Sequence, residues 1–350
     1  MGKTDIQWTD FSWNPVTGCT KVSQGCKNCY AERVFQRTVS DVCKCGRHKD
    51  DHVVFGGVGD GVETPVVCEG FEQRQFTDVL THPDRLEHPL HWRKPRRIFV
   101  NSMSDLFHED VPYEFIKQVW DVAAKARQHT YQILTKRPER MLEFARWMAG
   151  ADDISTAEWP GNCWLGISCE DQKTTDERIP ILLKTPAAVR FVSYEPALGP
   201  VDFTKLLQKK TGYTSPDLAT TSFDALRGKG TYPSRVTNIP IDVEGNHLDQ
   251  IIVGGESGPG ARPFNIQWAS DVIAQCKAAG VPCFVKQLGA VPVMNETEWR
   301  NQKPLTPLLN AARHNRAICT DLTVPLKFTD KKGGDWNEWP EDLRVREYPR

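Results

Sequence analysis

Short apolar strands that alternate with helical segments constrain the fold of this chain more than any other feature of its sequence. Apolar runs bounded by turn-forming residues predict strands, and apolar residues that recur every three or four positions predict helices. Strands are predicted at 98–100, 130–134, 163–167, 189–192, 250–253 and 282–285, with one more just before Cys19. Helices are predicted from Tyr30 onward and at 112–127, 138–148, 174–183 and 266–279.

Alternating strands and helices are typical of a parallel sheet covered by helices. The strands are apolar throughout, as expected where helices cover one face and a barrel interior the other. We therefore predict an α/β fold, a partial (β/α) barrel of six to seven parallel strands, with an open doubly wound sheet as the alternative. The chain is read as a single domain over 1–350, with a C-terminal extension from about 290.

Two segments interrupt this pattern and are interpreted as loop insertions. The segment at about 209–248 is rich in Ser, Thr, Gly and Pro and predicts a long irregular loop. The segment at about 38–70 carries Cys43, Cys45 and Cys68, with two histidines between them. These side chains are a candidate second metal site, for zinc, and a loop of free thiols is the alternative reading.

Polar or ionisable side chains follow nearly every predicted strand. In (β/α) barrels the active site is built at the carboxyl ends of the strands, so these groups are expected to share one site. Helix N-caps explain individual cases but not a repeated pattern. The groups are Ser102, Ser104 and Asp105; Lys136 and Arg137; Ser168 and Glu170; Ser193 and Glu195; Glu256 and Ser257; Lys286 and Gln287.

Three cysteines, Cys19, Cys26 and Cys29, lie in one loop after the first predicted strand, with the spacing C-x6-C-x2-C. Three thiolates can hold three corners of an iron–sulfur cluster. They can equally occupy three of the four positions around a tetrahedral zinc. Gly18 and Gly25 stand directly before two of the cysteines and allow the backbone to bend around a metal.

The number of cysteines and the net charge limit the classes of protein to which this chain can belong. The chain has 11 cysteines, an odd number, and several lie inside apolar strands, so reduced thiols fit better than a disulfide framework. The net charge of −1 gives no general attraction to nucleic acid. No apolar run approaches the ~18 residues of a membrane span and no signal peptide is evident, so a cytoplasmic protein without membrane partners is expected.

The cysteine loop after the first strand of a partial barrel resembles that of the radical S-adenosylmethionine (SAM) enzymes, whose commoner spacing is C-x3-C-x2-C. More of the chain resembles a phage and bacterial protein family with radical-SAM-like features. The matching stretches are 17–32, 99–108, 134–138, 254–258 and 284–287. Gly254-Gly255-Glu256 is similar to the GGE motif that receives the SAM amino group, although that motif normally follows an early strand.

This resemblance implies a [4Fe-4S] cluster on Cys19, Cys26 and Cys29, with SAM on the open iron. It makes Ser102, Ser104, Asp105, Lys136, Glu170, Glu195, Glu256 and Ser257 candidate cofactor contacts. Lys136 suits a SAM carboxylate or a substrate phosphate, and an ion pair with Glu170 or Glu195 is its alternative. His108, Cys169 and Tyr194 are weak catalytic candidates, and Cys169 is better explained as a small buried core residue.

The expected function is therefore a radical-SAM-type enzyme that cleaves SAM to start radical chemistry. It implies a flavodoxin- or ferredoxin-like electron donor and a nucleotide or nucleic-acid substrate. The alternatives are a metal-stabilised nucleic-acid-binding protein without catalysis, and an Fe–S barrel that binds SAM without radical chemistry.

Overall fold

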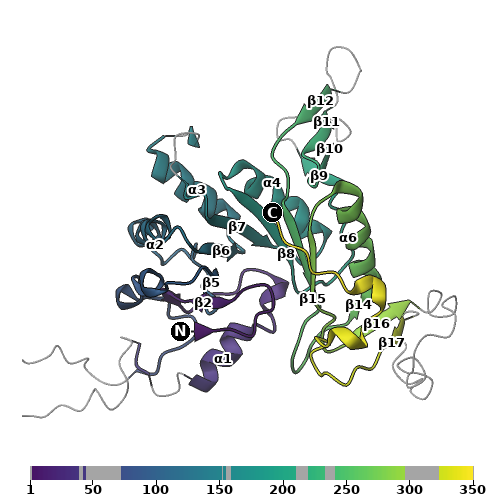
Figure 1. The fold of residues 1–350 in the computed structure, drawn as a ribbon, viewed down its shortest axis with the longest axis horizontal. Helices are drawn as coiled ribbons and strands as arrows, with labels where there is room; N and C mark the ends of the chain where they lie inside the picture. The colour runs from purple at the N-terminus through teal and green to yellow at the C-terminus, as the bar shows by residue number, and fades with distance from the viewer. Residues whose placement is uncertain are drawn as a thin grey trace, which may run out of the picture.

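A computed structural model of the protein describes residues 2–38, 42–44, 72–151, 153–154, 159–209, 220–232, 241–295 and 323–349. Its centre is an eight-stranded sheet in the order β1-β2-β5-β6-β7-β8-β13-β15 (Figure 1). The strands are β1 (Gly2–Lys3), β2 (Phe11–Trp13), β5 (Arg97–Val100), β6 (Thr130–Thr135), β7 (Cys163–Ser168), β8 (Val189–Tyr194), β13 (Gln250–Gly254) and β15 (Cys283–Gln287). Strand β1 is antiparallel to β2, and the other seven strands are parallel.

The order of these strands in the sheet is their order in the chain, and the seven parallel strands curl into a half-barrel. The helices lie around its outer face (Figure 1). They are α1 (Tyr30–Thr38), α2 (Tyr113–Lys125), α3 (Pro138–Ala149), α4 (Gln172–Lys184) and α6 (Ile266–Ala279). The predicted partial barrel is confirmed, because the alternating apolar pattern leaves few other ways to bury both faces of the strands.

Local sequence explains where these helices begin and end. Asp171 caps α4 by accepting the backbone N–H of Thr174 at 2.9 Å, and the Thr174 hydroxyl closes the capping box. Gly280 ends α6 at a φ of 72°, a left-handed conformation that glycine adopts without strain. Pro138 opens α3, where its missing N–H costs no hydrogen bond.

Side chains alternate between two apolar layers along each strand. The main core lies between the sheet and the outer helices and contains Ile98, Ile133, Leu165, Val192 and Ile251. A separate cluster fills the interior of the half-barrel with Trp8, Phe191, Ile252 and Phe284, against which Phe99, Leu134, Trp164 and Tyr348 pack. The Trp8 ring lies 4.7 Å from Phe99 of the nearby β5 and 6.0 Å from Phe191 of β8, so an aromatic side chain from the β1–β2 edge reaches across the inside of the curve.

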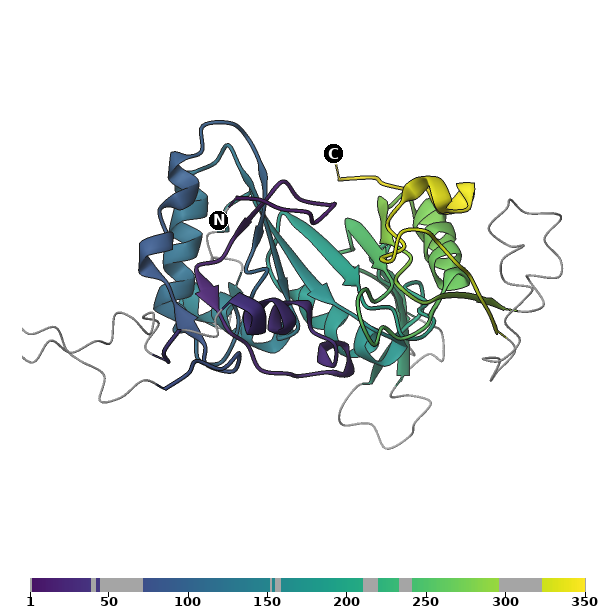
Figure 2. The ribbon, with the colours of Figure 1, turned by 90° about the horizontal axis from the view of Figure 1, so that it is seen from below.

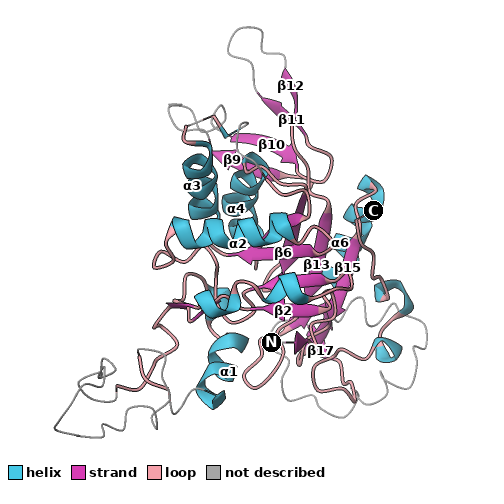
Figure 3. Ribbon diagram, turned by 60° about the vertical axis from the view of Figure 1, so that its left-hand side comes forward, coloured by secondary structure: helices cyan, strands magenta, loops and turns pink. Residues whose placement is uncertain are grey.

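The second insertion is not the irregular loop that its composition predicts. It contains a four-stranded antiparallel sheet in the order β12-β11-β10-β9, which projects from the body (Figure 3). The strands are β9 (Leu206–Lys209), β10 (Thr220–Asp224), β11 (Lys229–Tyr232) and β12 (Ile241–Glu244). Threonine is β-branched and favours strands, and Phe223 is buried, which explains why this Thr-rich segment forms a sheet.

Shorter elements complete the fold. They are β3 (Val16–Thr17), β4 (Leu80–Thr81), β14 (Phe264–Asn265), β16 (Pro292–Asn295), β17 (Thr323–Pro325) and the 3₁₀ helices η1 (Gln24–Cys26), η3 (Pro83–Arg85), η4 (His88–His91), η8 (Trp336–Glu338) and η9 (Glu341–Leu343). In the first insertion, Cys43 is buried and its backbone forms an isolated antiparallel β-bridge with Gln73. Cys45 and Cys68 lie outside the described residues. None of the described helices is long and apolar enough to cross a membrane.

The C-terminal segment pairs with the free edge of β15. The Val285 N–H donates to the Val345 carbonyl at 2.8 Å, and the Glu347 N–H donates to the Cys283 carbonyl at 2.9 Å. Tyr348 then reaches across to β5, where the Arg97 guanidinium lies 4.0 Å from the centre of its ring. The end of the chain therefore bridges the two sides of the half-barrel near the amino ends of its strands.

Candidate functional site

The three-cysteine loop is placed at the carboxyl ends of the strands. It follows β2 and β3, and α1 begins directly after Cys29. Gly18 adopts a φ of 94°, and a Cβ there would overlap the carbonyl group of Asp78, so only glycine fits this approach to Cys19. Figure 2 shows the purple segment around α1 along one edge of the molecule and the C-terminus at the opposite edge.

The side chains of Cys19, Cys26 and Cys29 are all partly exposed. Cys19 and Cys29 pack against Ala31, Phe35 and Phe76. Among the described residues, no group of three His, Cys, Asp or Glu side chains is arranged to hold one metal ion. The predicted second site is not tested, because Cys45 and Cys68 lie outside the described part of the chain.

Glu170, at the end of β7, anchors the middle of the cysteine loop. Its carboxylate is fully buried and accepts a hydrogen bond from the Ser23 hydroxyl at 2.8 Å. Arg178 of α4 forms an ion pair with it at 3.2 Å, so the buried charge is compensated. A Cβ at Gly25 would overlap the Glu170 carboxylate, so glycine is needed where the loop passes over this side chain.

Glu256, after β13, anchors the part of the loop between the second and third cysteines. Its carboxylate accepts a hydrogen bond from Asn28 at 3.0 Å and is held by Arg262 through bonds of 2.8 and 3.0 Å. Burial raises the pKa of Glu256, but the hydrogen bonds from Arg262 and Asn28 outweigh it and lower the pKa below its usual value. Arg262 also reaches the loop itself, through the Gln24 carbonyl at 3.0 Å.

Arg137, after β6, anchors the first cysteine. Its guanidinium pairs with Asp105 at 3.2 Å, donates to the Thr20 hydroxyl at 2.8 Å and lies 3.6 Å from the Cys19 sulfur. His108 is fully buried and also contacts the Thr20 hydroxyl, at 2.8 Å. The Asp105 carboxylate is occupied by Arg137, by the Thr135 hydroxyl and by backbone N–H groups, so it acts as a structural anchor.

Electrostatics distinguish the first two thiols. Burial and the Asp105 carboxylate raise the pKa of Cys19 to about 11, and Arg137 offsets only part of this. Burial also raises the pKa of Cys26, but the charge of Lys136 and hydrogen bonds from the loop backbone and Ser23 outweigh it, so the pKa is lowered. Thiolates are the form that binds metal, so Lys136 favours ligation at Cys26.

Lys136 is a strand-end cation that the loop anchors leave unpaired. Among the described residues its ammonium has no ion pair or hydrogen bond, and the predicted pairing with Glu170 or Glu195 does not form. Glu170 pairs with Arg178, and Glu195 pairs with Lys286 at 3.1 Å. The Ser193 hydroxyl donates to the same Glu195 carboxylate at 3.3 Å.

Several predicted site residues have other roles. Cys169 and Tyr194 lie on the outer face of the sheet within the main core, which the alternation of side chains along a strand explains. Burial raises the pKa of Cys169 to about 12, so this thiol stays protonated. Ser104 donates to the Val16 carbonyl at 2.8 Å, and Ser102 donates to Asn14 at 3.2 Å. Both serines therefore support the start of the cysteine loop.

Ser257 contributes through its backbone, since its carbonyl accepts from Arg33 of α1 at 2.9 Å. Sequence reasoning missed the anchoring roles of Arg33, Asn28, Ser23 and Arg178. Their partners lie far away in the chain, and no local pattern marks them. The one usable signal is the position of Glu170, an acidic residue at the end of an apolar strand. A carboxylate buried there requires a cationic partner.

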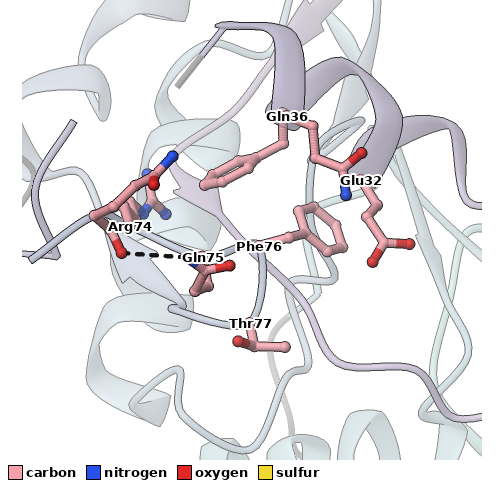
Figure 4. A pocket seen from close by; sticks show the side chains of 8 residues that line it. Glu32, Gln36, Arg74, Gln75, Phe76 and Thr77 are labelled. Carbon is pink, nitrogen blue, oxygen red and sulfur yellow. Dashed lines mark hydrogen bonds between the residues drawn. The ribbon is translucent and has the colours of Figure 1, made fainter. Parts of the chain in front are cut away.

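A cavity of about 230 Å³ lies behind the loop, between α1 and residues 73–77 (Figure 4). Its lining residues are Glu32, Phe35, Gln36, Gln73, Arg74, Gln75, Phe76 and Thr77. None of them is a polar strand-end residue or one of the three cysteines. The cavity adjoins the cysteine loop through Phe35 and Phe76, which pack against Cys19 and Cys29, but it does not include the strand-end groups.

Fold and site together define a class of protein. It is an α/β protein with an incomplete parallel barrel, and a three-cysteine loop is anchored at the carboxyl ends of the barrel strands. The chain belongs to the family described as protein of unknown function DUF5131, whose family model matches residues 3–334. This range includes the three cysteines and all of the strand-end anchors. No curated protein and no solved structure matches the chain.

Proposed function

We propose that the protein is a radical-SAM-type enzyme in which Cys19, Cys26 and Cys29 hold a [4Fe-4S] cluster. The observation that carries the proposal is the anchoring of one three-thiol loop by the ends of β6, β7 and β13, through Arg137, Glu170 and the Glu256 region. A merely structural metal loop needs no such connection to the edge of a barrel where active sites are built.

The donor set fits a cluster. Each thiolate of a [4Fe-4S] cluster binds a different iron. The three sulfurs therefore need not converge on a single ion. Three cysteine ligands would leave one iron open for SAM, and a cluster held there would supply the electron for reductive cleavage of the SAM sulfonium bond.

The chain's own residues would hold, charge-balance and shield this centre. Lys136 and Arg137 place two cations beside Cys26 and Cys19 and offset the negative charge of the thiolates. The aromatic cluster of Trp8, Phe191 and Phe284 fills the barrel interior and keeps water from approaching through it. The carboxylates of Asp105, Glu170 and Glu256 already pair with the arginines that anchor the loop. We therefore assign them positioning roles rather than direct cofactor contacts.

The groups left for ligands are Lys136, the Glu195–Lys286 pair and Ser193. The free ammonium of Lys136 suits a carboxylate or phosphate, which is consistent with a SAM carboxylate or a nucleotide substrate. Reductive cleavage consumes one electron, so a flavodoxin- or ferredoxin-like donor is part of the proposal.

Anaerobic reconstitution with iron and sulfide tests the proposal. We expect about four irons per chain, a cluster absorbance spectrum, and loss of both in Cys26→Ala. Cys276→Ala, which removes a buried thiol of α6, is the matched control and should retain the iron. With dithionite, the loaded protein should convert SAM to 5′-deoxyadenosine. Zinc without iron would overturn the cluster, and an intact cluster that leaves SAM uncleaved would overturn the radical chemistry.

A further inference from the structure

A basic surface lies at the opposite end of the strands from the cysteine loop. It consists of residues 91–97, which lead into β5, and residues 125–130, which lead into β6. The first segment contains Arg93, Lys94, Arg96 and Arg97, the second contains Lys125 and Arg127, and neither contains an acidic residue. We call these two segments the basic edge.

Hydrogen bonds hold the two segments of the basic edge together. The Gln128 side chain donates to the Trp92 carbonyl at 3.2 Å, and the Thr130 N–H donates to the Arg96 carbonyl at 2.9 Å. His129 is buried and contacts the Pro89 carbonyl at 3.1 Å. The cations are therefore carried on a fixed framework at the sheet edge, so little backbone entropy is lost when they bind a ligand.

The charge of the basic edge is largely uncompensated. Arg93, Lys94, Lys125 and Arg127 are exposed, and none has an ion pair among the described residues. Arg96 stacks on the Phe11 ring at 3.7 Å. Only Arg97 has an acidic partner, Asp10, at 3.5 Å, in an exposed pair that contributes little.

Several exposed lysines elsewhere on the molecule have acidic partners, whereas others, such as Lys184 and Lys277, have no ion pair among the described residues. Lys117 pairs with Asp121, Lys173 with Glu177, Lys205 with Asp202 and Lys229 with Glu244. The net charge of the whole chain is only −1. The excess of cations at the basic edge is therefore local, and a solvated surface of average composition does not account for it.

We propose that the basic edge binds the phosphate backbone of nucleic acid. Four of its six cations are arginines, whose planar fork matches phosphate oxygens bidentately. Binding to an anionic membrane surface would require an apolar face beside the cations. The only large exposed apolar side chain described in this region is Leu90. The contact requires no base reading, so it is independent of sequence.

This inference does not depend on the cluster. The basic edge lies at the amino ends of β5 and β6, whereas the cysteine loop is anchored at the carboxyl ends of the strands. Nucleic acid bound here is held outside the candidate active site. The basic edge is thus a second binding surface, whatever reaction the cysteine site performs.

The test is fluorescence anisotropy with a labelled oligonucleotide, single-stranded and duplex, at salt concentrations from about 50 to 200 mM. The full chain should bind both forms with an affinity that falls steeply with salt. Arg93→Glu/Lys94→Glu should weaken binding at least about tenfold and reduce the salt slope by about 2, one for each lost phosphate contact. Both side chains are exposed and unpaired, so the fold should persist, which circular dichroism checks.

The control is Lys205→Glu/Lys229→Glu, which makes the same change in net charge at a residue directly before β9 and at a residue of β11. It should bind as the unmodified protein does. A neutralising variant, Lys125→Gln/Arg127→Gln, should weaken binding in the same direction without adding acidic groups. Equal weakening by the control, no binding at low salt, or binding to anionic vesicles but not to oligonucleotides would each overturn the proposal.

Discussion

At the scale of single residues, the site depends on buried charges that are paired across the chain. Glu170 has no exposed surface, yet its pairing with Arg178 and its bond to Ser23 satisfy it. A buried pair of this kind adds little net stability compared with apolar side chains, but removing one partner is costly. Its value here is positional, because one oxygen of the carboxylate is directed to the cysteine loop.

Arg178→Met should therefore leave the buried Glu170 carboxylate without its cationic partner. This should lower the free energy of unfolding by about 3–5 kcal/mol. Lys173→Met on the exposed face of the same helix removes a solvent-exposed pair and should change it by less than about 1 kcal/mol. Urea unfolding followed by circular dichroism measures both. Similar small losses in the two variants would show that the Arg178–Glu170 pair does not hold this part of the fold.

His82 gives the region a pH dependence. It contacts the Thr17 hydroxyl at 2.7 Å just before the cysteine loop, and burial together with the charges of Arg85 and Arg74 lowers its pKa to about 4. An unfolded histidine titrates near about 6.5. Between these values the unfolded chain binds a proton that the folded protein does not, so stability is complete above pH ~6.5 and is lost as the pH falls toward 4.

We expect the loss of unfolding free energy between pH 7 and pH 5 to be smaller in His82→Gln, by about 1 kcal/mol after allowance for solvent screening. Glutamine can still hydrogen bond to Thr17, so stability at pH 7 should change little. Thermal or urea unfolding at both pH values provides the comparison. An unchanged pH dependence in the variant would assign the acid sensitivity to other groups.

At the scale of elements, the cysteine loop packs closely against the ends of the strands. Gly25 passes so near Glu170 that even one methyl group would overlap a carboxylate that Arg178 holds in place. Gly161, before β7, has nothing within 4 Å of the position a Cβ would take. The two glycines therefore separate the effect of crowding from the general effect of replacing glycine.

Gly25→Ala should lower the free energy of unfolding by about 1–3 kcal/mol, as overpacking does, and should make the three loop cysteines react faster with a thiol reagent. Gly161→Ala should leave both properties unchanged or slightly raise stability. Denaturation and peptide-level mass spectrometry of alkylated cysteines report the two effects. Equal cysteine reactivity in both variants would contradict the close fit.

At the scale of the whole molecule, the half-barrel is completed by its chain ends. The family match stops at residue 334, yet Trp339 and Leu343 beyond it are buried in the main core. The segment also covers the free edge of β15, and an uncovered edge strand invites aggregation.

A chain ending at residue 334 should lose at least about 5 kcal/mol of stability, since truncating one buried Trp and one buried Leu to Ala each costs several kcal/mol. That loss is as large as the whole stability of many domains, so we expect aggregation or unfolding. A chain ending at Tyr348 keeps these contacts and should match the full protein. Thermal unfolding and size-exclusion chromatography distinguish the two, and a soluble, cooperative 334-residue chain would refute the closing role.

Much of the fold was predictable because it depends on local periodicity. The strands from 98 to 285 and the helix limits at Pro138 and Gly280 follow from apolar spacing and capping residues. The four-stranded sheet at 206–244 was missed, since threonine-rich strands and polar loops have similar composition. The C-terminal pairing with β15 was also unpredictable, because it joins residues about 60 positions apart without a local signal.

The sequence by itself determined that polar groups and a three-thiol loop share the carboxyl edge of a parallel sheet, because the direction of parallel strands places every such loop at one edge. Only the tertiary structure decided which groups are free. Asp105, Glu170 and Glu256 are occupied by arginines from other segments, whereas Lys136 is left unpaired among the described residues. Ion pairing at short range depends on distances across the barrel, which linear spacing does not encode.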